Sequence, residues 1–177
     1  MRSRMSSRRS FAARRPASMP RARRRASRGA GAAGFPTWPV YTEAVAKLRH
    51  IAVVVRDLER AARFYQSVFE LERVGEEHID MGSAIYLSDG VINLALLKYK
   101  GEAGSGLKNA EGFVGAHHFG FQVEDLEQAK QRVEAAGGKF FFTLGKSKED
   151  ANFEVKYKDP DGVIFDLSEK GWLGTSK

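Results

Sequence analysis

Cysteine is absent from this 177-residue chain, which excludes disulfides, zinc–thiolate sites and a thiol nucleophile. Apolar runs are also short, and none approaches the roughly 18–20 residues that a membrane-spanning helix needs. Acidic residues are missing from residues 1–42, which contain 11 arginines, so the remaining chain holds 18 of the 29 basic residues against all 22 acidic ones. The net charge of +7 therefore resides in the N-terminal segment. Because the rest is mildly acidic, we predict neither a nucleic-acid nor a membrane partner.

The N-terminal segment, residues 1–42, is rich in Arg, Ser, Ala, Gly and Pro and has few large apolar residues. Such a composition cannot offset the entropic cost of ordering the backbone, so we predict a disordered extension followed by one folded domain at 43–177. Residues 7–11 are similar to a twin-arginine export signal without its apolar region, and an Arg- and Ser-rich leader is also typical of organelle import. A third alternative is a non-functional extension with Met19 as an internal start. Without import or export, the protein is expected in the cytoplasm.

A repeat organises the folded part of the chain. The stretch Arg49–Glu59 (RHIAVVVRDLE) returns 68 residues later as His117–Glu127 (HHFGFQVEDLE). In each copy a histidine, His50 or His118, opens a short apolar run, and an Asp-Leu-Glu begins seven residues after it. A helical pattern follows each copy. Repeats of this kind indicate two related structural units in one chain.

The two units have the same predicted order of elements. Ile51–Val55 is β-branched and predicts a strand buried on both faces. Asp57 is the predicted N-cap of a helix over 59–69, whose apolar face runs from Leu58 to Val68 or Phe69. The second unit repeats this with a strand at 119–123 and a helix at 127–136. Further strands are predicted at 84–87, 91–97, 139–144, 153–158 and 163–168. Between the units, the glycine-rich segment 100–115 predicts a long loop of functional interest.

The two His-strand-Asp-Leu-helix units, together with Asp-Pro-Asp-Gly-Val-Ile-Phe-Asp-Leu at 159–167, resemble the vicinal oxygen chelate superfamily, which includes glyoxalases, extradiol dioxygenases and bleomycin-resistance proteins. The resemblance covers residues 47–170. It implies an α+β fold with two βαβββ modules, at 47–99 and 116–170, whose curled mixed sheets surround a shared cavity. It also implies a homodimer.

Metal ligands in this superfamily come from the first and last strands of each module. By resemblance, these positions are His50, Asn93, His118 and Asp166. Asn93 and Asp166 depart from the family pattern, because each is shorter by one methylene than the usual Gln or Glu.

Two imidazoles and a carboxylate are also a chemically sensible ligand set for Fe, Mn, Ni, Co or Zn. A lone histidine in a strand is more often a hydrogen-bonded core residue, but matched positions in a repeat favour ligands. Asn93 is the weakest ligand of the four, and its side chain is equally suited to bonding the local backbone. His117 is expected to point to the opposite face from its neighbour, and Trp172 to serve packing. Tyr86 and Tyr157 either line the cavity or fill it.

The function implied is a metal-dependent enzyme that binds a small oxygen-rich substrate by bidentate chelation, of lyase, isomerase or dioxygenase type. Asp166 is then the candidate catalytic residue, serving as ligand and base. General-base catalysis needs a carboxylate that is free to move, which a short ligating side chain disfavours. The alternative is a metal-free small-molecule-binding protein of the bleomycin-resistance type.

Overall fold

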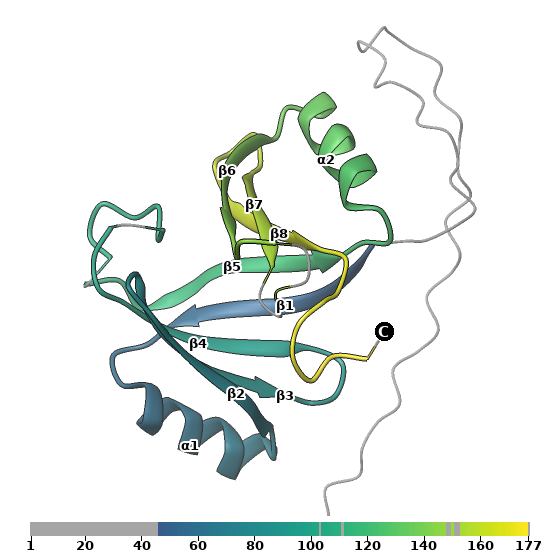
Figure 1. The fold of residues 1–177 in the computed structure, drawn as a ribbon. Coiled ribbons are helices and arrows are strands. Elements are labelled where there is room, and N and C mark those ends of the chain that lie inside the picture. Colours follow the sequence, from purple (N-terminus) through teal and green to yellow (C-terminus); the bar gives the residue numbers. More distant parts are fainter. Residues whose placement is uncertain (1–45, 103, 111, 148–149, 151–152, 177) are drawn as a thin grey trace, which may run out of the picture. The chain divides into compact units, whose positions relative to one another are not determined.

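The structure, a computed structural model, describes residues 46–176 except 103, 111, 148–149 and 151–152 (Figure 1). The predicted extension at 1–42 lies outside the described residues. The elements are, in order, β1 (Lys47–Val54), α1 (Leu58–Phe69), β2 (Glu72–Ile79), β3 (Gly82–Ser88), β4 (Asn93–Tyr99), β5 (Gly115–Gln122), α2 (Leu126–Ala135), β6 (Lys139–Leu144), β7 (Glu154–Lys158) and β8 (Ile164–Ser168). Each half thus has the order βαβββ.

Among the described residues, the strands form one eight-stranded mixed sheet in the order β2-β3-β4-β1-β5-β8-β7-β6. Within each module the first and last strands pair in parallel, β1 with β4 and β5 with β8. The antiparallel pair β1–β5 joins the two modules at the middle of the sheet (Figure 1). The predicted α+β class with two βαβββ modules is confirmed. No helix in the described part of the chain is long and apolar enough to cross a membrane.

Both helices begin as the sequence predicts. The carboxylates of Asp57 and Asp125 cap α1 and α2 by accepting hydrogen bonds from the backbone N–H three residues on, at 2.8 and 2.9 Å. The apolar face of α1 ends earlier than predicted. Val68 and Phe69 are more than half exposed, and Leu71 packs against the core from beyond the helix end.

Each module has its own apolar core on the helix side of the sheet. Ala62 of α1 packs with Leu87 and Leu96, whereas Leu126 of α2 packs with Tyr157 and Leu167. Tyr157 therefore fills a core and does not line the cavity. Side chains on the opposite face of the same strands point to the cavity, because successive residues of a strand alternate between faces.

Two strand predictions need correction. The βαβββ order implied by the resemblance includes the edge strand β2, but the residue pattern does not locate it, because its sequence ERVGEEHI is polar and interrupted by a glycine. The strand β1 is not buried on both faces. Ala52 and Val54 are buried but Ile51 and Val53 are only half-buried, since α1 packs against β2, β3 and β4 and leaves the outer face of β1 uncovered.

Candidate functional site

One row of residues crosses five neighbouring strands on the cavity face of the sheet. The pairing register places Asn93 opposite His50, His50 opposite Gly120, Gly120 opposite Asp166, and Asp166 opposite Lys156. His118 lies on β5 two residues before Gly120, so it projects from the same face. Strand pairing therefore brings residues that are far apart in the sequence into one cluster.

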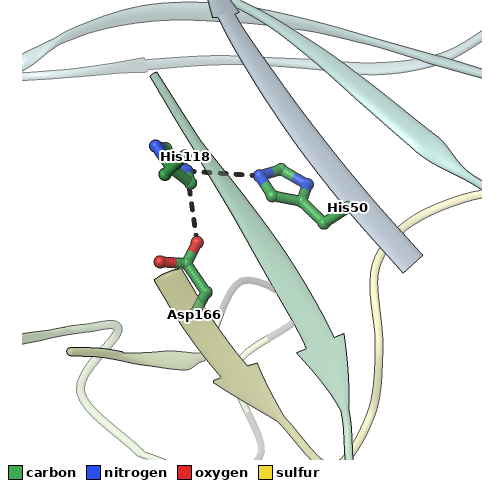
Figure 2. A group of neighbouring side chains, drawn as sticks. All are labelled: His50, His118 and Asp166. Carbon is green, nitrogen blue, oxygen red and sulfur yellow. Dashed lines mark hydrogen bonds and ion pairs between the residues drawn. The ribbon is translucent and has the colours of Figure 1, made fainter. Parts of the chain in front are cut away.

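The three residues with the strongest predicted ligand character converge in this cluster. Nε2 of His50 lies 3.3 Å from Nε2 of His118, which in turn lies 3.2 Å from Oδ2 of Asp166 (Figure 2). One donor atom from each of the three lies within 4.8 Å of the others, and all three side chains are buried. The structure thus brings His50, His118 and Asp166 together, while their role as metal ligands stays a prediction.

Asn93 orients His50. Its amide nitrogen donates to the Leu173 carbonyl at 2.9 Å, which leaves its oxygen to accept a hydrogen bond from Nδ1 of His50, also at 2.9 Å. His50 therefore carries its proton on Nδ1 and presents a bare Nε2 to the cavity. Burial lowers the pKa of His50 to about 3, which keeps the ring neutral. These contacts occupy both polar atoms of Asn93, so its predicted place as a ligand stays the weakest of the four.

His117 was expected on the opposite face, and that expectation is wrong. The register between β1 and β5 shifts at this point, since Ala52 pairs with His118 and Val53 with Ala116, so His117 is the extra residue of a bulge. Nδ1 of His117 lies 2.6 Å from Nδ1 of His118, and its Nε2 donates to the Ser105 carbonyl at 2.7 Å.

This chain of contacts fixes the proton of His118. A carbonyl only accepts, so His117 holds its proton on Nε2, and burial lowers its pKa to about 4 and keeps it neutral. Nδ1 of His117 must then accept a hydrogen bond from Nδ1 of His118. Nε2 of His118 is left bare, as it is in His50. The glycine-rich loop that provides Ser105 thereby contributes to the site.

Two bare ring nitrogens that face each other at 3.3 Å repel unless a cation or a proton lies between them. Ligand atoms about 2.1 Å from a metal ion and about 90–110° apart are separated by about 3.0–3.4 Å, which matches the distances from His118 to His50 and to Asp166. Asp166 adds a further sign of an absent partner, because its Oδ1 is buried and has no hydrogen-bond partner among the described residues. The donor set fits a divalent metal ion.

Lys156 of β7 is a part of the site that sequence reasoning missed. Its buried ammonium donates to Oδ2 of Asp166 at 2.6 Å, to Oε1 of Glu154 at 2.7 Å and to Nε2 of His118 at 3.3 Å. Burial alone would lower the pKa of Lys156, but the two carboxylates outweigh it and raise that pKa above its usual range. In turn, burial would raise the pKa of Asp166, but the charge of the Lys156 ammonium outweighs it and holds that pKa well below its usual range.

Trp172, from the C-terminal segment that follows β8, and Glu154 of β7 lie beside the cluster. The indole N–H of Trp172 donates to Oε2 of Glu154 at 2.7 Å, and its ring stacks on His50 with centroids 4.9 Å apart. Burial, followed by the charge of Asp166, raises the pKa of Glu154. The prediction that Trp172 serves packing is compatible with its stacking on His50, and the indole also contacts a polar member of the cluster, Glu154.

Gly120 makes room for Trp172. A Cβ atom at this position would lie 2.5 Å from the Trp172 ring and 3.0 Å from Cβ of His50, closer than van der Waals contact allows. The absence of a side chain at the centre of the row therefore permits the indole to stack on His50.

The cluster opens into a cavity of about 70 Å³, which His50, His118 and Lys156 line together with Tyr86 and Glu77. The phenol of Tyr86 donates to Oε2 of Glu77 at 2.8 Å. Glu77 was missed because residues 76–78 look like a polar connection. The available signal was the two-residue spacing of Gly75, Glu77 and Ile79, which places Glu77 on one face of a strand.

A basic groove of about 780 Å³ lies beside the cavity, and Lys98 and Tyr99 line both. Arg56 and Lys100 are also among its lining residues, and both are exposed. A cluster of cationic side chains of this kind favours a ligand with anionic groups.

The family model for the glyoxalase/bleomycin resistance protein/dioxygenase superfamily matches residues 47–167. The chain belongs to this superfamily. It is 34% identical over 136 residues to an ethylmalonyl-CoA/methylmalonyl-CoA epimerase of Cereibacter sphaeroides, a match that covers 71% of this chain and 98% of the relative. It is 25% identical over 130 residues to a lactoylglutathione lyase of Arabidopsis thaliana, with 69% of this chain and 44% of that longer protein covered. Both relatives are enzymes named for small-molecule substrates, which supports an enzyme of this superfamily.

Solved structures with the same fold include methylmalonyl-CoA epimerases. A variant of the Streptomyces coelicolor enzyme, in complex with 2-nitronate-propionyl-CoA, matches with a TM-score of 0.57 and 20% identity over 68% of this chain and 94% of that one. The Mycobacterium tuberculosis enzyme has a TM-score of 0.57 and 22% identity over 68% and 85% of the two chains. At this level of identity the likeness supports the fold.

Proposed function

We propose that the chain is a metal-dependent enzyme of this superfamily that moves a proton at a carbon next to a carbonyl group. The observation that carries the proposal is the convergence of two unprotonated ring nitrogens, of His50 and His118, on an oxygen of Asp166. A divalent ion at these atoms would be a Lewis acid that polarises the substrate's carbonyl oxygen.

The residues around this set give it a fixed geometry. Asn93 and His117 hold the two imidazoles in the tautomers that leave Nε2 bare. Such outer contacts orient metal ligands and raise their basicity. Trp172 stacks on His50 and lines the cavity beside it.

Glu77 is the better candidate for the base. Its carboxylate lines the cavity and accepts a hydrogen bond from the phenol of Tyr86, a neutral donor. Asp166, the catalytic candidate from the sequence, is instead held at 2.6 Å by the ammonium of Lys156. A carboxylate tied to an ammonium is a weak base, so we assign proton transfer to Glu77 and metal binding to Asp166.

The substrate proposed is a small acyl thioester with an anionic carrier. The relatives' names contain CoA esters and a glutathione adduct, both of which are thioesters with charged tails. The small cavity would receive the acyl group and the basic groove the tail. Epimerase-type proton transfer is favoured over dioxygenase chemistry because neither relative's name includes an O₂-dependent reaction.

Hydrogen exchange tests this function directly. Protein loaded with Co²⁺ or Mn²⁺ is incubated in D₂O with methylmalonyl-CoA, ethylmalonyl-CoA or lactoylglutathione, and loss of the α-proton signal is followed by NMR. We expect exchange with at least one thioester and a loss of about 10²–10⁴-fold in Glu77→Gln. Glu76→Gln, on the exposed face of the same strand, is the control. Equal exchange in Glu77→Gln and Glu76→Gln would contradict the assigned base.

The contacts of Lys156 favour a second candidate, a metal-free small-molecule-binding protein. A buried ammonium already balances part of the negative charge of Asp166 and Glu154. Thioester binding that survives exhaustive chelation, without exchange under any metal, would support this candidate. The homodimer implied by the resemblance and the cytoplasmic location stay predictions, which sedimentation and fractionation would check.

A further inference from the structure

We propose that Lys156 is an internal cation that competes with a divalent metal ion for Asp166 and His118. The inference rests on the proposed metal site and adds a control over its occupancy. It follows from the position of the ammonium, which contacts two of the three residues that would bind the ion.

The geometry leaves no room for both cations in their preferred places. Nζ of Lys156 donates to Nε2 of His118, the same atom that a metal would bind, and to Oδ2 of Asp166. An ion at the three ligands would break the first contact and weaken the second. It would also lie within a few Å of the ammonium charge, in a buried site where repulsion is weakly screened.

The Lys156 ammonium retains two interactions when it moves away from the ligands. Oε1 of Glu154 accepts its third hydrogen bond at 2.7 Å, and the Phe142 ring lies 5.8 Å from Nζ, at the outer limit of cation–π attraction. Glu154 is itself held by Trp172. These groups form a place on the β6–β7 side where the ammonium stays paired while an ion occupies the ligands.

The first module has no counterpart to this cation among its described residues. Pairing places Lys156 beside Asp166, and at the matching place beside Asn93 it has Ser88, whose hydroxyl donates to the Gly174 carbonyl at 2.8 Å. The charge is therefore a feature of the second module.

Metal titration of the full-length protein tests the inference. Chelator-treated wild type, Lys156→Met and Lys158→Met are titrated with Co²⁺, followed by calorimetry and by cobalt absorption bands. Lys158 is the matched control, because it lies on the same strand but packs over Phe141. We expect Lys156→Met to bind Co²⁺ at least about tenfold more tightly than wild type, and Lys158→Met to bind as wild type does.

The outcomes separate the two proposals. Equal affinity in wild type and Lys156→Met overturns the competition and leaves the metal site standing. No binding by any variant overturns both. Adding His118→Ala to Lys156→Met should remove the gain, and if the gain persists the ion binds elsewhere and the inference is wrong. Lys156→Gln, which keeps a polar group without charge, replaces Lys156→Met if circular dichroism shows that the latter does not fold.

Discussion

The two modules share a fold but contribute opposite kinds of chemistry to the site. The first offers a neutral pair, in which Asn93 holds a neutral His50. The second offers a charged set, in which Lys156 lies between Asp166 and Glu154. The repeat thus accounts for the matching positions of the two histidines, and the last two strands of the second module make the shared cavity asymmetric.

The charged half should be the more sensitive to loss of a partner, and Asp166→Asn should have the largest effect. It leaves the buried Lys156 ammonium with one carboxylate in place of two, so we expect about 3–5 kcal/mol of lost stability in urea unfolding. Metal binding should be lost as well. Asp161→Asn, at an exposed turn, is the control and should change stability by less than about 0.5 kcal/mol. A similar small effect for Asp166→Asn would show that the charged half is not a tight cluster.

The second largest loss of stability is expected at Gly120, where β5 of the second module pairs with β1 of the first. Gly120→Ala places a methyl group against the Trp172 ring and should cost about 1–3 kcal/mol, with a change in tryptophan fluorescence as the indole leaves His50. In a Trp172→Ala background, Gly120→Ala should cost less stability than it does in the wild type. Strictly additive effects would mean that the methyl group strains something other than the indole.

The neutral half should lose less than the charged half. Asn93→Ala leaves Nδ1 of His50 and the Leu173 carbonyl without partners, and we expect about 1–3 kcal/mol of lost stability, measured as for Asp166→Asn. Metal affinity should fall moderately, by about 10–100-fold, as for a residue that orients a ligand. Complete loss of binding would instead make Asn93 a ligand, as the resemblance implies.

The smallest difference in stability cost between the two modules is expected at their helix N-caps, which are alike. Asp57→Ala and Asp125→Ala each remove a helix cap with the same geometry, so each should cost about 1 kcal/mol. The two costs, from thermal or urea unfolding, should agree within about 0.5 kcal/mol. A large disparity would show that the modules differ in stability even where their local structure is the same.

The same contrast explains what the sequence predicts and what it does not. His50, His118 and the caps Asp57 and Asp125 follow from local patterns, because each has a fixed place relative to a strand or helix of its own unit. The bulge at His117 depends instead on the register between β1 and β5, which no residue nearby in sequence determines. The expectation that neighbours in a strand alternate therefore failed at this residue.

Lys156 and Glu77 show a second limit. Alternation at 153–158 predicts a strand with one polar face, and polar faces normally lie toward solvent. Only the pairing of Lys156 with Asp166 across β7 and β8 shows that this face points into the cavity, where the carboxylates offset the cost of burial. Glu77 depends in the same way on an edge strand that has no apolar pattern.

A crystal structure grown with Co²⁺, with diffraction data at the cobalt absorption edge, tests the central claim most directly. The proposed site predicts one anomalous peak about 2.1 Å from Nε2 of His50, Nε2 of His118 and an oxygen of Asp166. The ammonium of Lys156 should then have turned from His118 toward Glu154. A fully occupied peak elsewhere, with Lys156 still bonded to His118 and Asp166, would contradict both the metal site and the competition for it.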